Sequence, residues 1–230
     1  MNYSQFQTHK HRFTSAFRKV LCESGKSEQL VEAGFCAYAD ANPLIRFLFW
    51  RRLWLTVKFL NLHGPYESIL DFGCGSGVAL QLMSQLAGRV VGVDINLEPC
   101  RLLSSHLPLP ENAELFDIKE RPLSGFEEGK FEVVVSLDVL EHVDDLHEAF
   151  SHLSRLCKPG GVIVFSGPTE NLVYKIGRRI AGKEYTGTYH VRNIYDVRKV
   201  AELYMEVETL ATLYYPLPLF KIYVGRVPMA

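Results

Sequence analysis

The chain has 230 residues, of which 47% are hydrophobic and 22% are charged, and its formal net charge is −1. This length suits one α/β domain with small additions, and the composition excludes disorder over most of the chain. The near-zero net charge excludes a global field that would attract nucleic acid or acidic lipid, although it leaves local basic patches open.

Cysteine usage and the N-terminal residues indicate a protein of the reducing cytoplasm. The five cysteines are odd in number, and no two are spaced as Cys-x-x-Cys. We therefore expect neither a disulfide framework nor a structural zinc site. Residues 1–15 lack the apolar core of a secretory signal. Cations interrupt the most apolar stretch, residues 44–60, whereas a bilayer-spanning helix needs about 20 mostly uncharged residues.

Residues up to about Asn61 are expected to form helices. Asn42 is a suitable N-cap with Pro43 in the first helical position, and His63, Gly64 and Pro65 should end this helix. Its apolar residues surround nearly the whole cylinder. We expect a helix packed against the core whose cations extend outwards; a helix lying on a membrane surface is the alternative. These cations are Arg46, Arg51, Arg52 and Lys58.

From Tyr66 the chain alternates between strand and helix patterns. The predicted strands are 67–73, 88–94, 113–118, 131–139 and 161–168, and the predicted helices are 77–87, 97–107 and 146–157, the last ended by Lys158, Pro159, Gly160 and Gly161. Alternation of this kind predicts a parallel sheet with right-handed crossovers. The nearly continuous apolar strands indicate that both faces of the sheet are covered.

The pattern breaks after Pro168. Residues 169–193 are polar and basic, and we interpret about 168–193 as a lid insertion; a helix at 194–204 and strands at 206–215 and 219–227 follow. The sequence therefore predicts a Rossmann-like, doubly wound, mostly parallel seven-stranded sheet with N-terminal helices and a lid after the fifth strand. The expected division is an N-terminal helical cap, 1–64, and a second domain, 65–230.

A glycine-rich turn follows the first predicted strand. Asp71, Gly73, Gly75 and Gly77 form a D-x-G-x-G-x-G pattern that opens a helix. Glycines permit a tight turn and the close approach of a ligand. A simple tight turn in the core is the alternative, because a lone glycine pattern is weak evidence.

Two acids strengthen the interpretation of this turn as a binding site. Asp94 ends the second predicted strand, and Asp117 lies near the end of the third. A carboxylate at the end of the second strand can accept both ribose hydroxyls of an adenosine, and Asp117 can accept from the adenine amino group. Ligands of doubly wound sheets bind beyond these strand ends.

Ordered motifs give this region a family resemblance. "ILDFGCGSG", "VVGVDIN", "LFDI", "FEVVVSLDVLEHVDD" and "LCKPGGVIVFS" resemble those of class I S-adenosylmethionine-dependent methyltransferases, over roughly Glu67 to Ser166. Within that class, the L-E-H-V and K-P-G-G segments are similar to the ubiquinone-biosynthesis O-methyltransferase and type 11/12 group. The resemblance implies methyl transfer from S-adenosylmethionine to an oxygen of a small, lipophilic molecule.

The resemblance also implies roles for particular residues. The three glycines would pass under the methionine part of the cofactor, Asp94 would bind ribose, Asp117 and the backbone of Ile118 would bind adenine, and backbone near Ser136 would accept from the ammonium group. Asp71 would position the loop. The full set expected to bind cofactor is Asp71, Gly73, Cys74, Gly75, Gly77, Asp94, Ile95, Asp117, Ile118, Ser136 and Leu137.

Catalysis needs little beyond alignment, because the cofactor already activates the methyl group. A hydroxyl acceptor benefits from a base, and the candidates are His142, His190, Glu141 and Asp138. His142 follows the fourth strand, and His190 lies in the "TGTYHVRN" stretch of the lid. The alternatives are a capping histidine and a surface histidine. We expect no metal ion, because adjacent positions in the run 141–145 converge poorly and Asp144 should cap the next helix.

The glycine loop and the two acids are also compatible with two other kinds of protein: a NAD-dependent oxidoreductase, and a non-catalytic cofactor-binding or scaffold protein. No serine accompanies the one Tyr-x-x-x-Lys spacing in the sequence, Tyr195 with Lys199, which disfavours the first. The expected partner is a small-molecule methyl acceptor. We expect no nucleic acid. The basic residues 174–183 indicate either peripheral membrane contact or a solvated face.

Overall fold

The computed structural model describes residues 1–25, 27–170, 192–214, 216 and 218–229. His190, the basic residues 174–183 and all but the ends of the predicted lid lie outside the described residues. The chain divides into two compact units, Met1–Glu67 with Gly73–Arg121, and Ser68–Phe72 with Pro122–Ala230.

One seven-stranded sheet has the order β3-β2-β1-β4-β5-β7-β6. Its strands are β1 (Tyr66–Phe72), β2 (Ala87–Asp94), β3 (Ala113–Asp117), β4 (Phe131–Leu137), β5 (Cys157–Pro168), β6 (Glu206–Leu213) and β7 (Phe220–Arg226). The pairs β1–β4, β2–β3 and β4–β5 are parallel, whereas β7 is antiparallel to β5 and β6. The predicted fold class, a mostly parallel doubly wound sheet, is confirmed.

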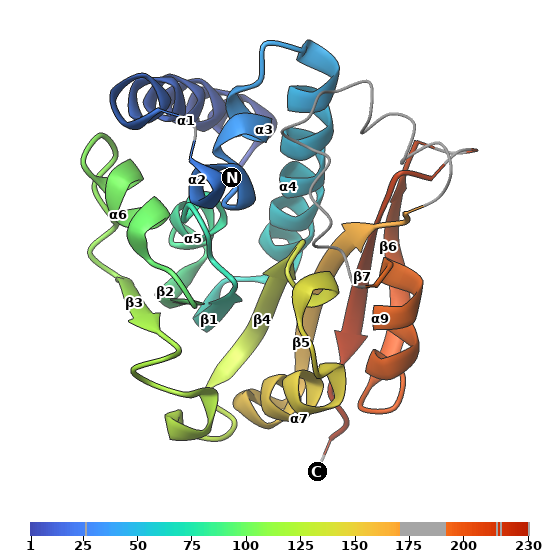
Figure 1. The fold of residues 1–230 in the computed structure, drawn as a ribbon. Helices are drawn as coiled ribbons and strands as arrows, with labels where there is room; N and C mark the ends of the chain where they lie inside the picture. Colours follow the sequence, from blue (N-terminus) through green and yellow to red (C-terminus); the bar gives the residue numbers. More distant parts are fainter. Residues whose placement is uncertain (26, 171–191, 215, 217, 230) are drawn as a thin grey trace. The chain divides into compact units, whose positions relative to one another are not determined.

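The first unit combines the N-terminal helices with β2 and β3 (Figure 1). Its helices are α1 (Tyr3–Ser24), α2 (Glu28–Glu32), α3 (Phe35–Ala39), α4 (Pro43–His63), α5 (Val78–Met83) and α6 (Glu98–Ser104). Asn42 caps α4 by accepting from the Leu44 amide at 2.9 Å, and Gly64 follows its last residue, as predicted. Asn2 and Gln5 form a capping box at the start of α1.

Aromatic side chains hold α1, α3 and α4 together. The rings of Phe17 and Phe35 meet edge to face at 4.7 Å, and Trp50 meets Tyr38 at 5.0 Å and Phe6 at 5.9 Å. The indole N–H of Trp50 donates to the Tyr38 carbonyl at 3.1 Å. These rings bury a large apolar area, and the indole is satisfied in the interior.

One cation of α4 contradicts the expectation that all four extend outwards. Arg52 is only 3% exposed, its guanidinium donates to the Tyr38 hydroxyl at 3.4 Å, and it stacks over the Phe49 ring at 4.9 Å from the centroid. A planar guanidinium tolerates an aromatic environment better than an ammonium does. Arg51 and Lys58 are exposed as predicted.

The second unit contains the remaining strands with α7 (Leu146–Leu156), α9 (Ile194–Ala201) and the short 3₁₀ helices η1 (Leu123–Gly125) and η2 (Leu140–His142). The prediction that β5 begins at residue 161 was wrong, because the strand starts at Cys157. Phe131 pairs with Cys157 and Val133 with Val162, so the K-P-G-G segment bulges within the strand rather than preceding it.

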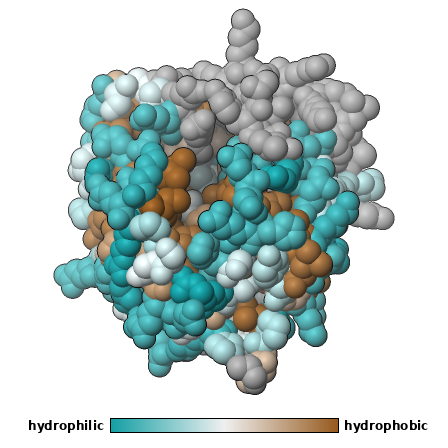
Figure 2. Space-filling view, turned by 60° about the horizontal axis from the view of Figure 1, so that its bottom comes forward, coloured by the Kyte–Doolittle hydropathy of each residue, from teal (hydrophilic) through white to brown (hydrophobic). Residues whose placement is uncertain are grey.

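Hydrophilic side chains predominate on the surface shown in Figure 2, and hydrophobic ones form small separate patches there. Among the residues that the structure describes, no helix combines the length and apolar character that a membrane crossing requires.

Candidate functional site

The glycine turn of the first unit is fastened to the end of β2. The amides of Gly73 and Cys74 both donate to the Val93 carbonyl, at 2.8 and 3.1 Å, and the Gly77 amide donates to the Cys74 carbonyl at 2.7 Å. Cys74 is buried. The loop therefore has a defined shape before any ligand arrives.

All three glycines of the turn have positive φ: 76° at Gly73, 50° at Gly75 and 76° at Gly77. A Cβ on Gly77 would also lie 2.6 Å from the Cys100 sulfur. L-residues are strained in this backbone region, and a side chain at Gly77 has no room. The predicted requirement for glycine thus has two physical causes at this position.

The two predicted carboxylates lie at the same edge of the sheet. Asp94 and Asp117 are direct register partners on the parallel strands β2 and β3. One Asp94 carboxylate oxygen accepts from the Gly75 amide at 2.8 Å, and the other accepts from the Asn96 amide at 3.1 Å. The carboxylate of Asp94 therefore faces the glycine turn. An Asp117 oxygen accepts from the Lys119 amide at 2.8 Å.

Burial raises the pKa of the Asp94 carboxyl above its usual value, and the nearby Asp117 charge adds to this effect. Hydrogen bonds from the Gly75, Asn96 and Ile95 amides oppose it. An ionised carboxylate oxygen has more than one lone pair. Asp94 can therefore accept further hydrogen bonds from ligand hydroxyl groups while it holds the turn.

Apolar side chains adjoin these carboxylates. Ile95 is 58% exposed, and Ile118 is half-buried. The Ile118 amide donates to the Asp94 carbonyl at 3.0 Å. This bond occupies the Ile118 N–H, so the side chain and the carbonyl of Ile118 remain available to a ligand.

In the second unit, the end of β4 turns sharply into η2. Asp138 has a φ of 57°, its amide donates to the Ser166 carbonyl at 3.0 Å, and the Ser166 hydroxyl donates to its carboxylate at 3.0 Å. Ser136 is fully buried at the end of β4, and Leu137 is half-buried. Asp71, on β1, is 2% exposed.

In the loop after β4, the acid and the neighbouring histidine differ in burial. Glu141 is fully buried, and its carboxylate would lie 3.4 Å from a Cβ on Gly167. His142, Asp144 and Asp145 are exposed. The prediction that Asp144 caps α7 was wrong, since Asp145 accepts from the Glu148 amide at 2.9 Å. Within the described ranges there is no group of three or more metal-ligating side chains.

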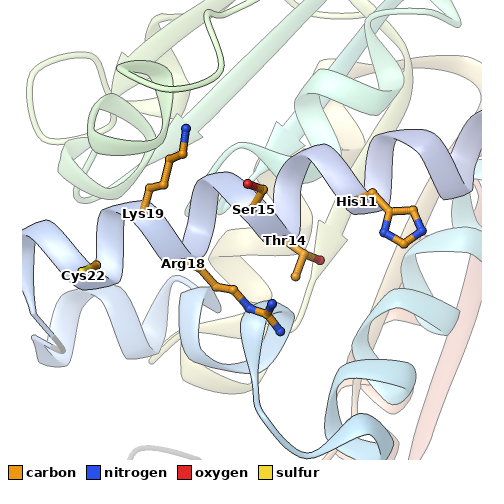
Figure 3. Close-up of a pocket in the computed structure, with 6 residues that line it drawn as sticks. All are labelled: His11, Thr14, Ser15, Arg18, Lys19 and Cys22. Carbon is orange, nitrogen blue, oxygen red and sulfur yellow. The ribbon is translucent and has the colours of Figure 1, made fainter.

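A hollow elsewhere in the first unit contains none of the predicted site residues. It runs along α1 and is lined by His11, Thr14, Ser15, Arg18, Lys19 and Cys22 (Figure 3). All six side chains come from a single helix. The hollow is therefore a surface feature of α1 and not the place where strand ends converge.

Residues remote in the sequence, which no local pattern predicts, also shape the glycine turn. The backbone of Ala33 lies 3.6 Å from a Cβ built on Gly75. Gly92 of β2 leaves room for Leu80 and Leu115, which a Cβ there would meet. Each contact joins segments far apart in the chain, so no local pattern reveals it. A glycine inside the otherwise bulky second strand was the only available signal.

The sheet order, the glycine turn and the paired carboxylates together define a Rossmann-like protein that binds an adenosine-containing cofactor.

The comparisons identify the family. Residues 42–208 match the methyltransferase domain family. A ubiquinone biosynthesis O-methyltransferase of Pseudomonas fluorescens (strain Pf0-1) is 32% identical over 170 residues, which cover 73% of this chain and 68% of that protein. The chain therefore belongs to the methyltransferase domain family, and it is an S-adenosylmethionine-dependent methyltransferase. The oxidoreductase and scaffold alternatives are not favoured.

Solved structures show the same fold. The N-methyltransferase NodS from Bradyrhizobium japonicum WM9 in complex with S-adenosyl-L-homocysteine has a TM-score of 0.61 at 16% identity, covering 93% of this chain and 98% of that one. The magnesium protoporphyrin IX methyltransferase ChlM from Synechocystis PCC 6803 has a TM-score of 0.57 at 20% identity, covering 87% and 100%.

The described residues fit this cofactor. Each carboxylate oxygen of Asp94 accepts one backbone hydrogen bond, from Gly75 or from Asn96, and can also accept one from a ribose hydroxyl. The exposed Ile95 offers an apolar surface to a purine. Gly73, Gly75 and Gly77 give the turn a positive-φ backbone that L-residues rarely adopt and leave it without side chains where a ligand would approach.

Proposed function

We propose that this methyltransferase transfers a methyl group to an oxygen of a small molecule. The observation that carries the proposal is the likeness to O-methyltransferases at 32% identity over most of the chain. Since the relatives act in ubiquinone biosynthesis by name, lipophilic phenols are the first acceptors to try.

The predicted cofactor-binding residues of each unit have the following proposed roles. Asp94 binds the ribose hydroxyls, Asp117 and Ile118 bind adenine, and Ile95 packs on the purine. The turn containing Gly73, Cys74, Gly75 and Gly77 lies under the methionine part. Main-chain carbonyls at Ser136 and Leu137 accept from the ammonium group, and Asp71 positions the turn. The support is the hydrogen bonding of Asp94 and its register with Asp117.

When bound, S-adenosylmethionine would supply an electrophilic methyl carbon, and the electron pair of its bond to sulfur would remain on sulfur as a neutral thioether. The protein aligns the acceptor oxygen in line with that bond and excludes water, which can lower the barrier by about 7–11 kcal/mol. His142 accepts the hydroxyl proton as the new carbon–oxygen bond forms. Its exposed position on η2, after β4, supports this role. His190 is proposed as a second acceptor-site residue, on the sequence resemblance alone.

Transfer of the labelled methyl group from S-adenosylmethionine to matched phenols, alcohols and amines tests the acceptor. We expect labelled methyl ethers from phenols. Labelled amines without any ether would contradict transfer to oxygen, and label transfer to none of the acceptors despite cofactor binding would contradict the choice of acceptor class.

We also propose peripheral contact with an anionic membrane surface through α4. Leu44, Phe47 and Leu62 are 59%, 48% and 69% exposed, and Arg51 and Lys58 are exposed at helical spacing along the same side. No acidic residue occurs in α4. An apolar stripe with cations suits an anionic lipid surface, where a lipophilic acceptor would be found.

The remaining proposals concern location and organisation. None of the five cysteines lies in a disulfide bond and four of them are buried, which supports a reducing cytoplasm. We retain the proposal that residues 1–64 form a helical cap on a methyltransferase domain of residues 65–230; the packing of α1, α3 and α4 through aromatic rings supports it.

A further inference from the structure

The loop between β4 and α7 carries the proposed base, and its two ends are well fixed. At one end, the Asp138 amide and carboxylate are both bonded to Ser166. At the other end, Asp145 caps α7. Between them, η2 is held by the bonds from the His142 amide to the Val139 carbonyl at 2.9 Å and from the Val143 amide to the Leu140 carbonyl at 3.3 Å.

The stretch just after His142 is held by a residue distant in sequence. The Arg192 guanidinium donates to the Val143 carbonyl and, through its second terminal nitrogen, to the Asp144 carbonyl at 2.8 Å. A planar guanidinium can hold two successive carbonyl oxygens at once, whereas a lysine presents a single point of attachment. Arg192 therefore fixes the orientation of the Val143–Asp144 and Asp144–Asp145 peptide groups, the first of which begins one residue after His142.

Arg192 is itself well anchored. Its neighbour Asn193 caps α9 by accepting from the Tyr195 and Asp196 amides at 2.9 and 3.2 Å. The next residue, Ile194, is fully buried and lies 3.1 Å from a Cβ built on Gly167 of β5. The Arg192 side chain therefore extends from the capped start of α9, which is fixed, to the loop after β4.

We propose that Arg192 is a positioning residue for methyl transfer, which holds the loop after β4 so that His142 is directed at the acceptor. The inference rests on the proposed function, in which His142 is the base. A displacement of about 1 Å at a reacting group can cost as much as 10²-fold in rate, so the loss of both carbonyl contacts should lower kcat.

The second unit provides a matched control. Arg155 also donates to two main-chain carbonyls, those of Leu123 at 2.7 Å and Phe126 at 3.1 Å, at η1. No predicted site residue lies in η1. Replacing Arg155 by alanine therefore measures the general effect of losing such a bridge, separately from any effect on the loop that carries His142.

The experiment compares R192A, R192K, R155A, H142A and the double variant H142A/R192A, using the phenol that the acceptor screen identifies. We expect R192A to lower kcat at least about tenfold while the Kd for S-adenosylhomocysteine stays within about twofold. R192K should recover little, added methylguanidinium should restore part of the R192A rate, and R155A should stay within about twofold of wild type. Because Arg192 acts through His142, adding R192A to H142A should not lower kcat below that of H142A alone.

Several results would overturn the proposal: an unchanged kcat in R192A, an equal loss in R155A, or a full additional loss in the double variant. Full activity in H142A would reject both the base assignment and the route through it, while leaving methyl transfer to oxygen intact. Hydrogen exchange of residues 138–145 needs no acceptor. Faster exchange there in R192A and not in R155A is expected, and unchanged exchange would contradict the anchoring itself.

Discussion

Gly77 and Gly34 share the left-handed backbone conformation but differ in their surroundings. Their φ and ψ angles are 76° and 12° at Gly77 and 81° and 3° at Gly34, yet a Cβ on Gly77 would meet the Cys100 sulfur at 2.6 Å, whereas one on Gly34 would come no closer than 3.1 Å to the Tyr38 ring. The pair therefore separates backbone strain from steric exclusion at the cofactor turn.

We expect Gly34→Ala to lower the free energy of unfolding by about 1–2 kcal/mol, chiefly from backbone strain. Gly77→Ala should lower it by about 2–4 kcal/mol, because overpacking adds to the strain. Urea denaturation of both variants measures the difference. Equal losses of unfolding free energy would show that the Cys100 side chain can move away at little cost. Only the backbone conformation would then require glycine at position 77.

Asp94 should make cofactor affinity depend on pH. The ionised carboxylate is the form that accepts ribose hydroxyls, and burial raises the pKa of this carboxyl above its usual value of 3.8. Affinity should therefore be full at neutral pH and fall on acidification, beginning at a higher pH than an ordinary aspartate would show. Calorimetry with S-adenosylhomocysteine between about pH 7 and 4.5 checks this expectation. An affinity that is flat over that range, or the same fall in Asp94→Asn, would contradict it.

The sequence predicted the residues of the turn and its two acids, because strand ends and glycines are local signals. It could not predict Cys100, Ala33 or Arg192, which act on the site through contacts across the fold. The burial of Arg52 was missed for the same reason, since it depends on Tyr38 and Phe49.

At the scale of elements, α4 differs from what its sequence predicts in the apolar side chains that it leaves exposed. It is capped and ended as its sequence predicts, but three large apolar side chains remain exposed beside Arg51 and Lys58. Its apolar residues surround the helix, so periodicity alone could not identify which side would be left uncovered.

We expect the double variant F47S/L62S to lose most of its binding to phosphatidylglycerol vesicles, because the apolar anchor is removed while the cations remain. Co-sedimentation at low salt measures this loss. Leu203→Ser is the control, since Leu203 is 71% exposed in the second unit and outside α4. Equal binding of all three proteins, or a wild-type protein that stays in the supernatant, would rule out the α4 surface.

The start of β5, which lies at Cys157 and not at the predicted residue 161, shows why the ends of a strand are hard to predict. The K-P-G-G segment has the composition of a turn, yet Cys157 already pairs with Phe131. Gly160, with a φ of 75°, and the bond from its amide to the Val227 carbonyl accommodate the bulge. The partner strand, and not the local residues, determines where β5 begins.

For the whole molecule, average composition concealed an uneven charge distribution. Residues 1–63 contain nine lysines and arginines against four aspartates and glutamates, although the formal net charge of the chain is −1. The strand–helix alternation predicted a mostly parallel sheet, but the antiparallel placement of β7 between β5 and β6 depends on pairings that no local pattern encodes. Strand order is therefore a feature of the folded arrangement.

The central claim is that the glycine turn and Asp94 hold the adenosine part of the cofactor. Titration calorimetry of S-adenosylhomocysteine into wild type, Asp94→Ala and Glu114→Ala tests it most directly. Glu114 lies on β3 like Asp117 but pairs with Arg89 at 2.7 Å. We predict that Asp94→Ala weakens binding at least about tenfold, as expected for lost hydrogen bonds to a charged group, and that Glu114→Ala stays within about twofold of wild type. No binding to wild type, or equal binding to Asp94→Ala, would contradict the account.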